Sequence, residues 1–240
     1  FIHMQFDQWS LTTMTGYHLV QHTGSFFEYV PDEYASLRDT YIKYRDAQIA
    51  EFGTQTNAIW DAIPDMVHVS GYSFYALSRV LARISIQLII HHPLLFIKSA
   101  GSGWWMFWRA PVYWSADAVK LQTLVPLIKL VVQTQRPMIF LANLAFIFTS
   151  LYFAIIEILA IIRQKPLPLS KRFNNPTLYS FTWMLLTNIW IASFLQTLLD
   201  HGDNPRFLVP MQSLVVLWVA LFVFTMINTR NMRTTEVAQT

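Results

Sequence analysis

The chain has 240 residues, of which 54% are hydrophobic, 15% aromatic and only 13% charged. This composition is too apolar for an ordinary soluble domain of this length and indicates a membrane protein. The formal net charge is +3, but the basic residues form neither long clusters nor stripes interleaved with aromatic residues, so no nucleic-acid partner is expected. Cysteine is absent, which excludes a disulfide framework and a thiolate metal site.

Near the N-terminus, His18 and His22 are four residues apart, a spacing that would place two imidazoles on one face of a helix. Gly16 and Gly24 argue against a stable helix there, and no third ligand is indicated. We therefore predict no metal site. The chain also has no Walker loop, GxGxxG, GxSxG or HExxH motif, and no cofactor is predicted.

Residues 1–117 are predicted to be mainly helical. One amphipathic helix follows Pro31 and closes at Gly53, a second covers about 57–67, and a third begins at Ser73. In the third helix an apolar face is expected opposite a polar one. The residues expected on the polar face are Ser78, Arg79, Arg83 and Gln87.

The segment 104–114, WWMFWRAPVYW, places four tryptophans and a tyrosine around Arg109. Such rings have an apolar body and a polar edge, which suits the headgroup zone of a membrane. The stretch 118–136 is apolar but is interrupted by Lys120, Pro126 and Lys129. We expect it to lie along the interface, with a fourth membrane span as the alternative.

Three long apolar stretches follow, at 138–162, 178–199 and 207–227. Each can cross a hydrocarbon core about 30 Å thick as a helix. Glu157 is the only ionisable residue within them. Because it lies close to the end of its span, we expect it to be partly exposed at the interface; a buried proton relay is the alternative.

The charges between and after these spans predict their orientation. The loop after 162 has four bases and no acid, and the tail after 227 is also basic, so both are expected in the cytoplasm. The chain begins at Phe1 without an export signal, so we expect further membrane helices upstream and a C-terminal part of a longer protein. The expected parts are an outer region (1–117), an interfacial segment (118–136), a membrane region (137–227) and a cytoplasmic tail (228–240).

The turn DHGDNPRF at 200–207 opens the third span on the outer face. Free N–H groups at a helix N-terminus and the guanidinium of Arg206 could bind one phosphate together. In the other interpretation Asp203 or Asn204 caps the helix and Arg206 extends to lipid headgroups.

Three places in the sequence resemble one enzyme family. They are SLTTMTGYHLVQHTG at 10–24, the block YIKYRDAQIAEFG with NAIWDAIPDM and then SFYALSR, and GDNPRFLVPMQSLVVL, which is similar to an N-P-R-[FY]-x-x-P segment. With these the chain resembles the C-terminal part of bacterial membrane glycosyltransferases of the GT-C class. That group includes the protein O-mannosyltransferase-like and lipopolysaccharide-core-type enzymes.

The resemblance implies an all-α membrane protein with an outer helical domain followed by three transmembrane helices. It also implies transfer of a sugar from a polyprenyl-phosphate donor to a glycan, lipid or protein acceptor on the outer face. The catalytic acid would lie upstream of this chain. The residues expected to contact substrate are Thr12, Thr13, Gly16, Asp203, Asn204 and Arg206. The alternative is a non-catalytic membrane scaffold or assembly subunit whose outer domain binds another protein.

Overall fold

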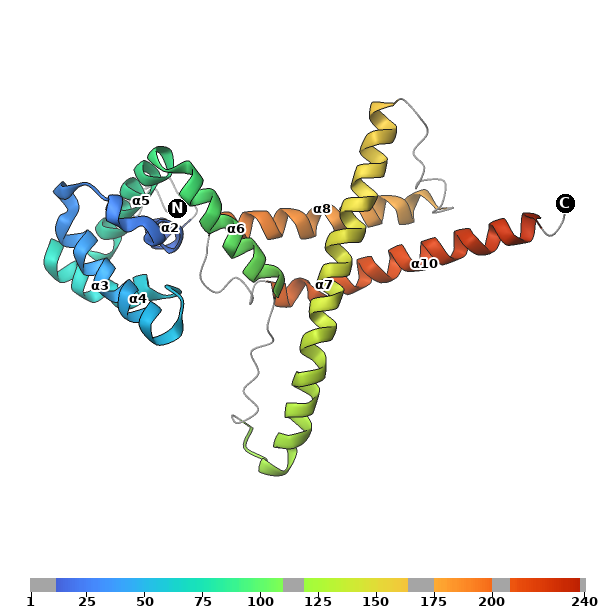
Figure 1. Cartoon of the computed structure of the whole chain (residues 1–240), viewed down its shortest axis with the longest axis horizontal. Helices are drawn as coiled ribbons and strands as arrows, with labels where there is room; N and C mark the ends of the chain where they lie inside the picture. The colour runs from blue at the N-terminus through green and yellow to red at the C-terminus, as the bar shows by residue number, and fades with distance from the viewer. Residues whose placement is uncertain (1–11, 110–118, 164–174, 200–207, 238–240) are drawn as a thin grey trace. The chain divides into compact units, whose positions relative to one another are not determined.

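The computed structural model describes residues 12–109, 119–163, 175–199 and 208–237, and every element in these ranges is a helix (Figure 1). The chain divides into two compact units. The N-terminal unit comprises Phe1–Met106 with Leu195–Asn204, and the C-terminal unit comprises Phe107–Phe194 with Pro205–Thr240.

The predicted helices of the N-terminal half are confirmed. α3 ends at Gly53, whose φ of 71° is the left-handed conformation that glycine adopts readily. α5 begins after Ser73, whose side chain accepts a hydrogen bond from the backbone N–H of Ala76. The elements of this half are α2 (Thr15–Thr23), η1 (Gly24–Tyr29), η2 (Asp32–Tyr34), α3 (Ala35–Phe52), α4 (Ala58–Ser70), α5 (Phe74–His91) and α6 (Pro93–Arg109).

The core of the N-terminal unit lies where α2 packs along α5 and α3 packs along α4 (Figure 1). Tyr17 is fully buried, and its hydroxyl donates a 2.6 Å hydrogen bond to the backbone carbonyl of Phe74. The ring of Phe27 packs on the ring of Tyr41 with centroids 4.7 Å apart. These contacts join segments that are far apart in the sequence, so the unit is held by tertiary packing.

Two sequence-based expectations about this core are wrong. Gly16 and Gly24 do not prevent a helix, because packing along α5 stabilises α2 in spite of its weak local propensity. Ser78 is not on an exposed polar face but is fully buried. It lies where α2 meets α5, and its Oγ accepts a 3.2 Å hydrogen bond from the backbone N–H of Gly16.

Arg45 links α3 to the segment that precedes it. Its guanidinium donates to the carbonyl of Gly24 at 3.1 Å and forms ion pairs with Glu28 at 2.7 Å and Asp46 at 2.9 Å. Arg45 is buried, whereas the side chains of Glu28 and Asp46 are more than half exposed. Solvent therefore weakens both ion pairs.

We predict an acid-dependent loss of stability that involves this contact. The hydrogen bond from Arg45 lowers the pKa of Glu28 from its ordinary value of 4.5, and burial opposes this only in part. Because the folded-state pKa is the lower one, the stabilisation is present above pH 4.5 and is lost as the pH falls through the folded-state pKa. Thermal unfolding between pH 7 and pH values below 4.5 should show a smaller pH dependence in Arg45→Met than in the control Lys43→Met. An equal pH dependence in the two variants would contradict this assignment.

Three helices among the described residues are long and apolar enough to cross a membrane, which confirms the three predicted apolar stretches. They span Gln122–Ile162, Pro176–Leu198 and Val209–Ile227. α4 and α5 pass the same test only when taken together, and they are bent by 101° at their junction. The elements of this half are η4 (Gln122–Leu124), α7 (Val125–Ile162), α8 (Pro176–Leu199), η6 (Val209–Met211) and α10 (Gln212–Val237).

α7 is longer than the predicted first span, because the helix continues through Pro137. The residues expected to form an interfacial segment are thus joined to the span without a break from Val125 onward. Their position relative to the lipid stays a prediction, as does the side of the membrane on which each loop lies.

Aromatic side chains fill the contact of α7 with α8 and α10 in the C-terminal unit. Trp218 of α10 is fully buried, and its ring stacks on Phe222 with centroids 5.3 Å apart. It also meets Phe146 of α7 edge to face at 5.4 Å. The Trp218 Nε1–H donates a 3.1 Å hydrogen bond to the backbone carbonyl of Thr182 in α8. One indole therefore contacts three helices.

Glu157 is fully buried in α7, so the expected partial exposure is wrong. Its carboxylate accepts a 3.1 Å hydrogen bond from the hydroxyl of Tyr179 in α8. Glu157 is buried because α8 packs against this part of α7. The sequence of α7 alone could not predict that contact. A buried carboxyl group requires a hydrogen-bond partner, and the Tyr179 hydroxyl provides one.

Candidate functional site

A pocket of about 370 Å³ lies in the N-terminal unit. Its walls come from η1, the end of α3 with the following loop, and α6. The lining residues are Ser25, Phe26, Ile49, Gly53, Thr54, Gln55, Leu95, Lys98, Ser99 and Ser102. We refer to this space as the Lys98 pocket.

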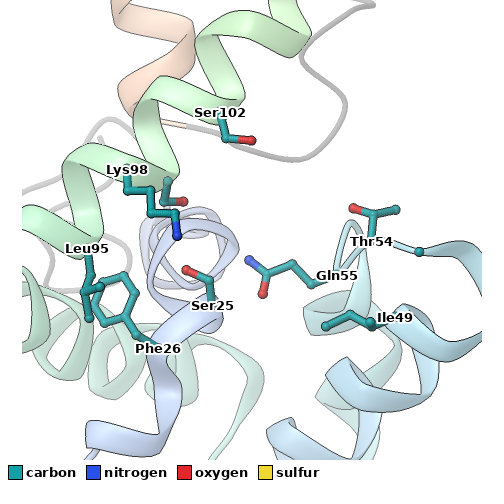
Figure 2. Close-up of a pocket in the computed structure, with 10 residues that line it drawn as sticks. Ser25, Phe26, Ile49, Thr54, Gln55, Leu95, Lys98 and Ser102 are labelled. Carbon is teal, nitrogen blue, oxygen red and sulfur yellow. The ribbon is translucent and has the colours of Figure 1, made fainter.

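Polar groups from three elements approach one another in the Lys98 pocket. Figure 2 shows the ammonium of Lys98, the hydroxyl of Ser25 and the amide of Gln55 directed toward its centre. The Ser25 hydroxyl donates a 3.0 Å hydrogen bond to the carbonyl of His22, and the Gln55 amide donates a 3.0 Å hydrogen bond to the carbonyl of Gln21. Both side chains are thereby held in position by the backbone of α2.

The loop between α3 and α4 forms one wall of the pocket. Gly53 ends α3 with a positive φ, and the next residues, Thr54 and Gln55, turn toward α6 (Figure 2). The hydroxyls of Thr54 and Thr56 are hydrogen-bonded to each other at 2.8 Å. Asn57 then starts α4, also with a positive φ of 70°. The loop is therefore a defined turn with two left-handed residues.

Next to the pocket, α6 is tied to α2. The hydroxyl of Ser99 and the Nδ1 of His22 are 3.2 Å apart, and both side chains are buried. The ring of His22 also meets Phe96 edge to face, with centroids 5.5 Å apart. These contacts hold α6 in register on α2, and with it Lys98.

The lining chemistry suits a polar or anionic ligand. Lys98 supplies an ammonium, four hydroxyl side chains and one amide supply further donors and acceptors, and Phe26 and Leu95 form an apolar side. Among the residues that the structure describes, the lining has no carboxylate and no imidazole. These groups can bind phosphate or sugar hydroxyls.

A second hollow of about 450 Å³ lies between η1, η2 and the end of α5. Its residues include Glu33, His91 and His92, and the ring of Tyr29 lies 4.3 Å from that of His92. The described parts of the chain contain no group of three or more acidic or histidine side chains placed to hold a metal ion. His18, one of the two histidines considered as metal ligands, packs its ring edge to face on Trp60, with centroids 5.7 Å apart.

Of the predicted substrate residues that the structure describes, Thr12, Thr13 and Gly16, none lines the Lys98 pocket. Thr12 accepts a hydrogen bond from the N–H of Met14 at 3.2 Å and, through its carbonyl, one from the Thr15 hydroxyl at 2.9 Å, so it shapes the turn that precedes α2. Thr13 lies in the same turn. Gly16 is buried against α5. Asp203, Asn204 and Arg206 lie outside the described residues.

No sequence signal pointed to the Lys98 pocket. Its key side chains, Ser25, Gln55 and Lys98, belong to no recognisable sequence motif. Ser25 and Lys98 are separated along the chain by η2, α3, α4 and α5. The sequence predicted only that a helix ends at Gly53, which lies in one wall of the pocket.

Comparison of the chain with models of protein families, with curated proteins and with solved structures finds no match. The resemblance to GT-C class glycosyltransferases therefore stays a prediction.

Proposed function

We propose that the chain is part of a membrane glycosyltransferase that takes its sugar from a polyprenyl-phosphate donor on the outer face of the membrane. One observation carries the proposal: the N-terminal unit has a pocket lined by an ammonium, hydroxyls and an amide, and the same chain has three helices able to cross a membrane. A lipid-linked sugar phosphate needs both, because its headgroup is anionic and hydroxylated while its tail stays in the bilayer.

In this proposal the Lys98 pocket holds the polar head of the substrate. The ammonium of Lys98 offsets phosphate charge, and Ser25 and Gln55 hydrogen-bond to sugar hydroxyls. Phe26 provides an apolar surface for a sugar ring. Asp203, Asn204 and Arg206 remain predicted substrate contacts from the resemblance, and the catalytic acid is expected upstream of this chain.

Replacement of Lys98 by glutamine tests the proposal. We expect sugar transfer by the complete protein in membranes to fall about tenfold or more, because a charge-assisted hydrogen bond contributes about 1.5–3 kcal/mol. Lys43→Gln is the matched control, because it removes the same charge from an exposed position of α3 in the same unit. Arg206→Ala, assayed in parallel, should lower transfer more than it lowers membrane insertion. Equal transfer by the Lys98 and Lys43 variants would reject the role of the pocket.

The second candidate is a non-catalytic scaffold or assembly subunit that binds another protein. It is favoured by the described residues that line the Lys98 pocket, which include neither a carboxylate nor an imidazole. The two candidates differ in what the complete protein must contain. The enzyme requires an acidic residue in an early outer loop, and the scaffold does not. If the chain is part of the enzyme, replacement of that acid by its amide should abolish sugar transfer.

A further inference from the structure

An exposed apolar ridge runs from the end of α5 along α6. Its members are Ile90, Leu94, Ile97 and Trp105, which are 69%, 78%, 62% and 45% exposed. The last three follow helical spacing on one face of α6, with Gly101 between them, while Ser99, Gly103 and Phe107 are buried. We call this surface the α6 ridge. Single exposed apolar residues are ordinary, but several large ones on one face of a helix indicate a binding surface.

The charges of the N-terminal unit are divided between its helices. Residues 66–109, which include α5 and α6, contain no acidic residue and have four exposed bases: Arg79, Arg83, Lys98 and Arg109. Residues 32–65, which include α3 and α4, are acidic overall. Their acidic residues are Asp32, Glu33, Asp39, Asp46, Glu51, Asp61 and Asp65, against the bases Arg38, Lys43 and Arg45. The apolar ridge therefore belongs to the purely basic pair of helices.

We infer that the α6 ridge lies in the headgroup region of a bilayer that contains anionic phospholipid. An apolar stripe flanked only by bases is the pattern of a helix at a membrane surface, where large side chains enter the acyl boundary and bases meet phosphates. α6 also leads in the chain to the helices that are able to cross a membrane. The acidic α3 and α4 are unsuited to such a surface because anionic headgroups would repel them.

The absence of cysteine makes a direct test possible, because a single introduced cysteine is the only site for a thiol-reactive spin label. We would label Leu94→Cys and Ile97→Cys in the full chain, reconstituted at one chain per nanodisc that contains phosphatidylglycerol. Phe52→Cys is the matched control, because Phe52 is also a large apolar residue, is 61% exposed and lies at the end of α3. Power saturation then compares collision with oxygen, which concentrates in lipid, and with a water-soluble nickel chelate.

We expect the ratio of oxygen to nickel collisions to be several-fold higher at residues 94 and 97 than at residue 52. Similar ratios at the three positions would overturn the inference. Protection of residues 94 and 97 from both reagents would overturn it too, in favour of a protein occupant. Because the measurement involves no sugar transfer, its result is independent of the proposed enzymatic function.

Discussion

Gly16→Ala is expected to destabilise the N-terminal unit by about 3 kcal/mol, near the upper end of the usual cost of overpacking. A Cβ at this position would overlap the backbone carbonyl oxygen of Ser78 and lie 2.8 Å from the backbone N of Ala82. Both atoms belong to the backbone of α5, so no side-chain rotation can relieve the overlap. α2 would have to move away from α5 and would lose the contact between the Gly16 N–H and the Ser78 hydroxyl.

Gly101→Ala is the matched control for this prediction. Gly101 is also a helical glycine, but no atom lies within 4 Å of a Cβ built there. Its replacement should stabilise α6 by up to about 1 kcal/mol, because alanine has the higher helix propensity. Thermal unfolding followed by circular dichroism would measure both variants. If Gly16→Ala unfolded like the parent protein but lost transfer activity, a substrate-contacting role for Gly16 would replace the packing role described above.

Trp218→Ala is expected to destabilise the C-terminal unit by about 3 kcal/mol or more, the usual cost of removing a buried tryptophan. The substitution removes the stack on Phe222, the edge contact with Phe146 and the hydrogen bond to the carbonyl of Thr182. Trp218→Phe keeps a ring but not the donor, and it should cost about 1 kcal/mol.

Phe224→Ala is the control in the same helix. Its side chain is 59% exposed, and lipid should cover it in a membrane, so the substitution should change the free energy of unfolding little. Unfolding by sodium dodecyl sulfate in bicelles would rank the three variants. Equal destabilisation by Trp218→Ala and Phe224→Ala would contradict the packing of α10 described here.

The sequence predicted only one local feature of the candidate site, the helix end at Gly53. Gly53 was correctly predicted to end a helix, and it forms one wall of the Lys98 pocket. The predicted substrate residues Thr12, Thr13 and Gly16 form a turn and a helix contact outside that pocket. The pocket itself unites Ser25, Gln55 and Lys98, which no spacing rule connects because three different elements supply them.

Local patterns in the sequence predicted the helical class, the C-terminal end of α3, the start of α5 and the three apolar stretches able to cross a membrane. These features depend on residues that are neighbours along the chain: a glycine after a helix, a serine before one, or some twenty apolar residues in a row. Their free energies are set by local conformation and by transfer from water to lipid, and both can be read from a short window.

Which polar residues are buried, and where a ligand can bind, depends on packing between helices that are distant in the chain. Ser78 is buried because Gly16 lets α2 approach α5, and Glu157 is buried because Tyr179 of another helix covers it. The helicity of α2 likewise depends on α5. Burial of a polar group is favourable only when a partner satisfies it, and here the partner lies many residues away in the chain, beyond the reach of local periodicity.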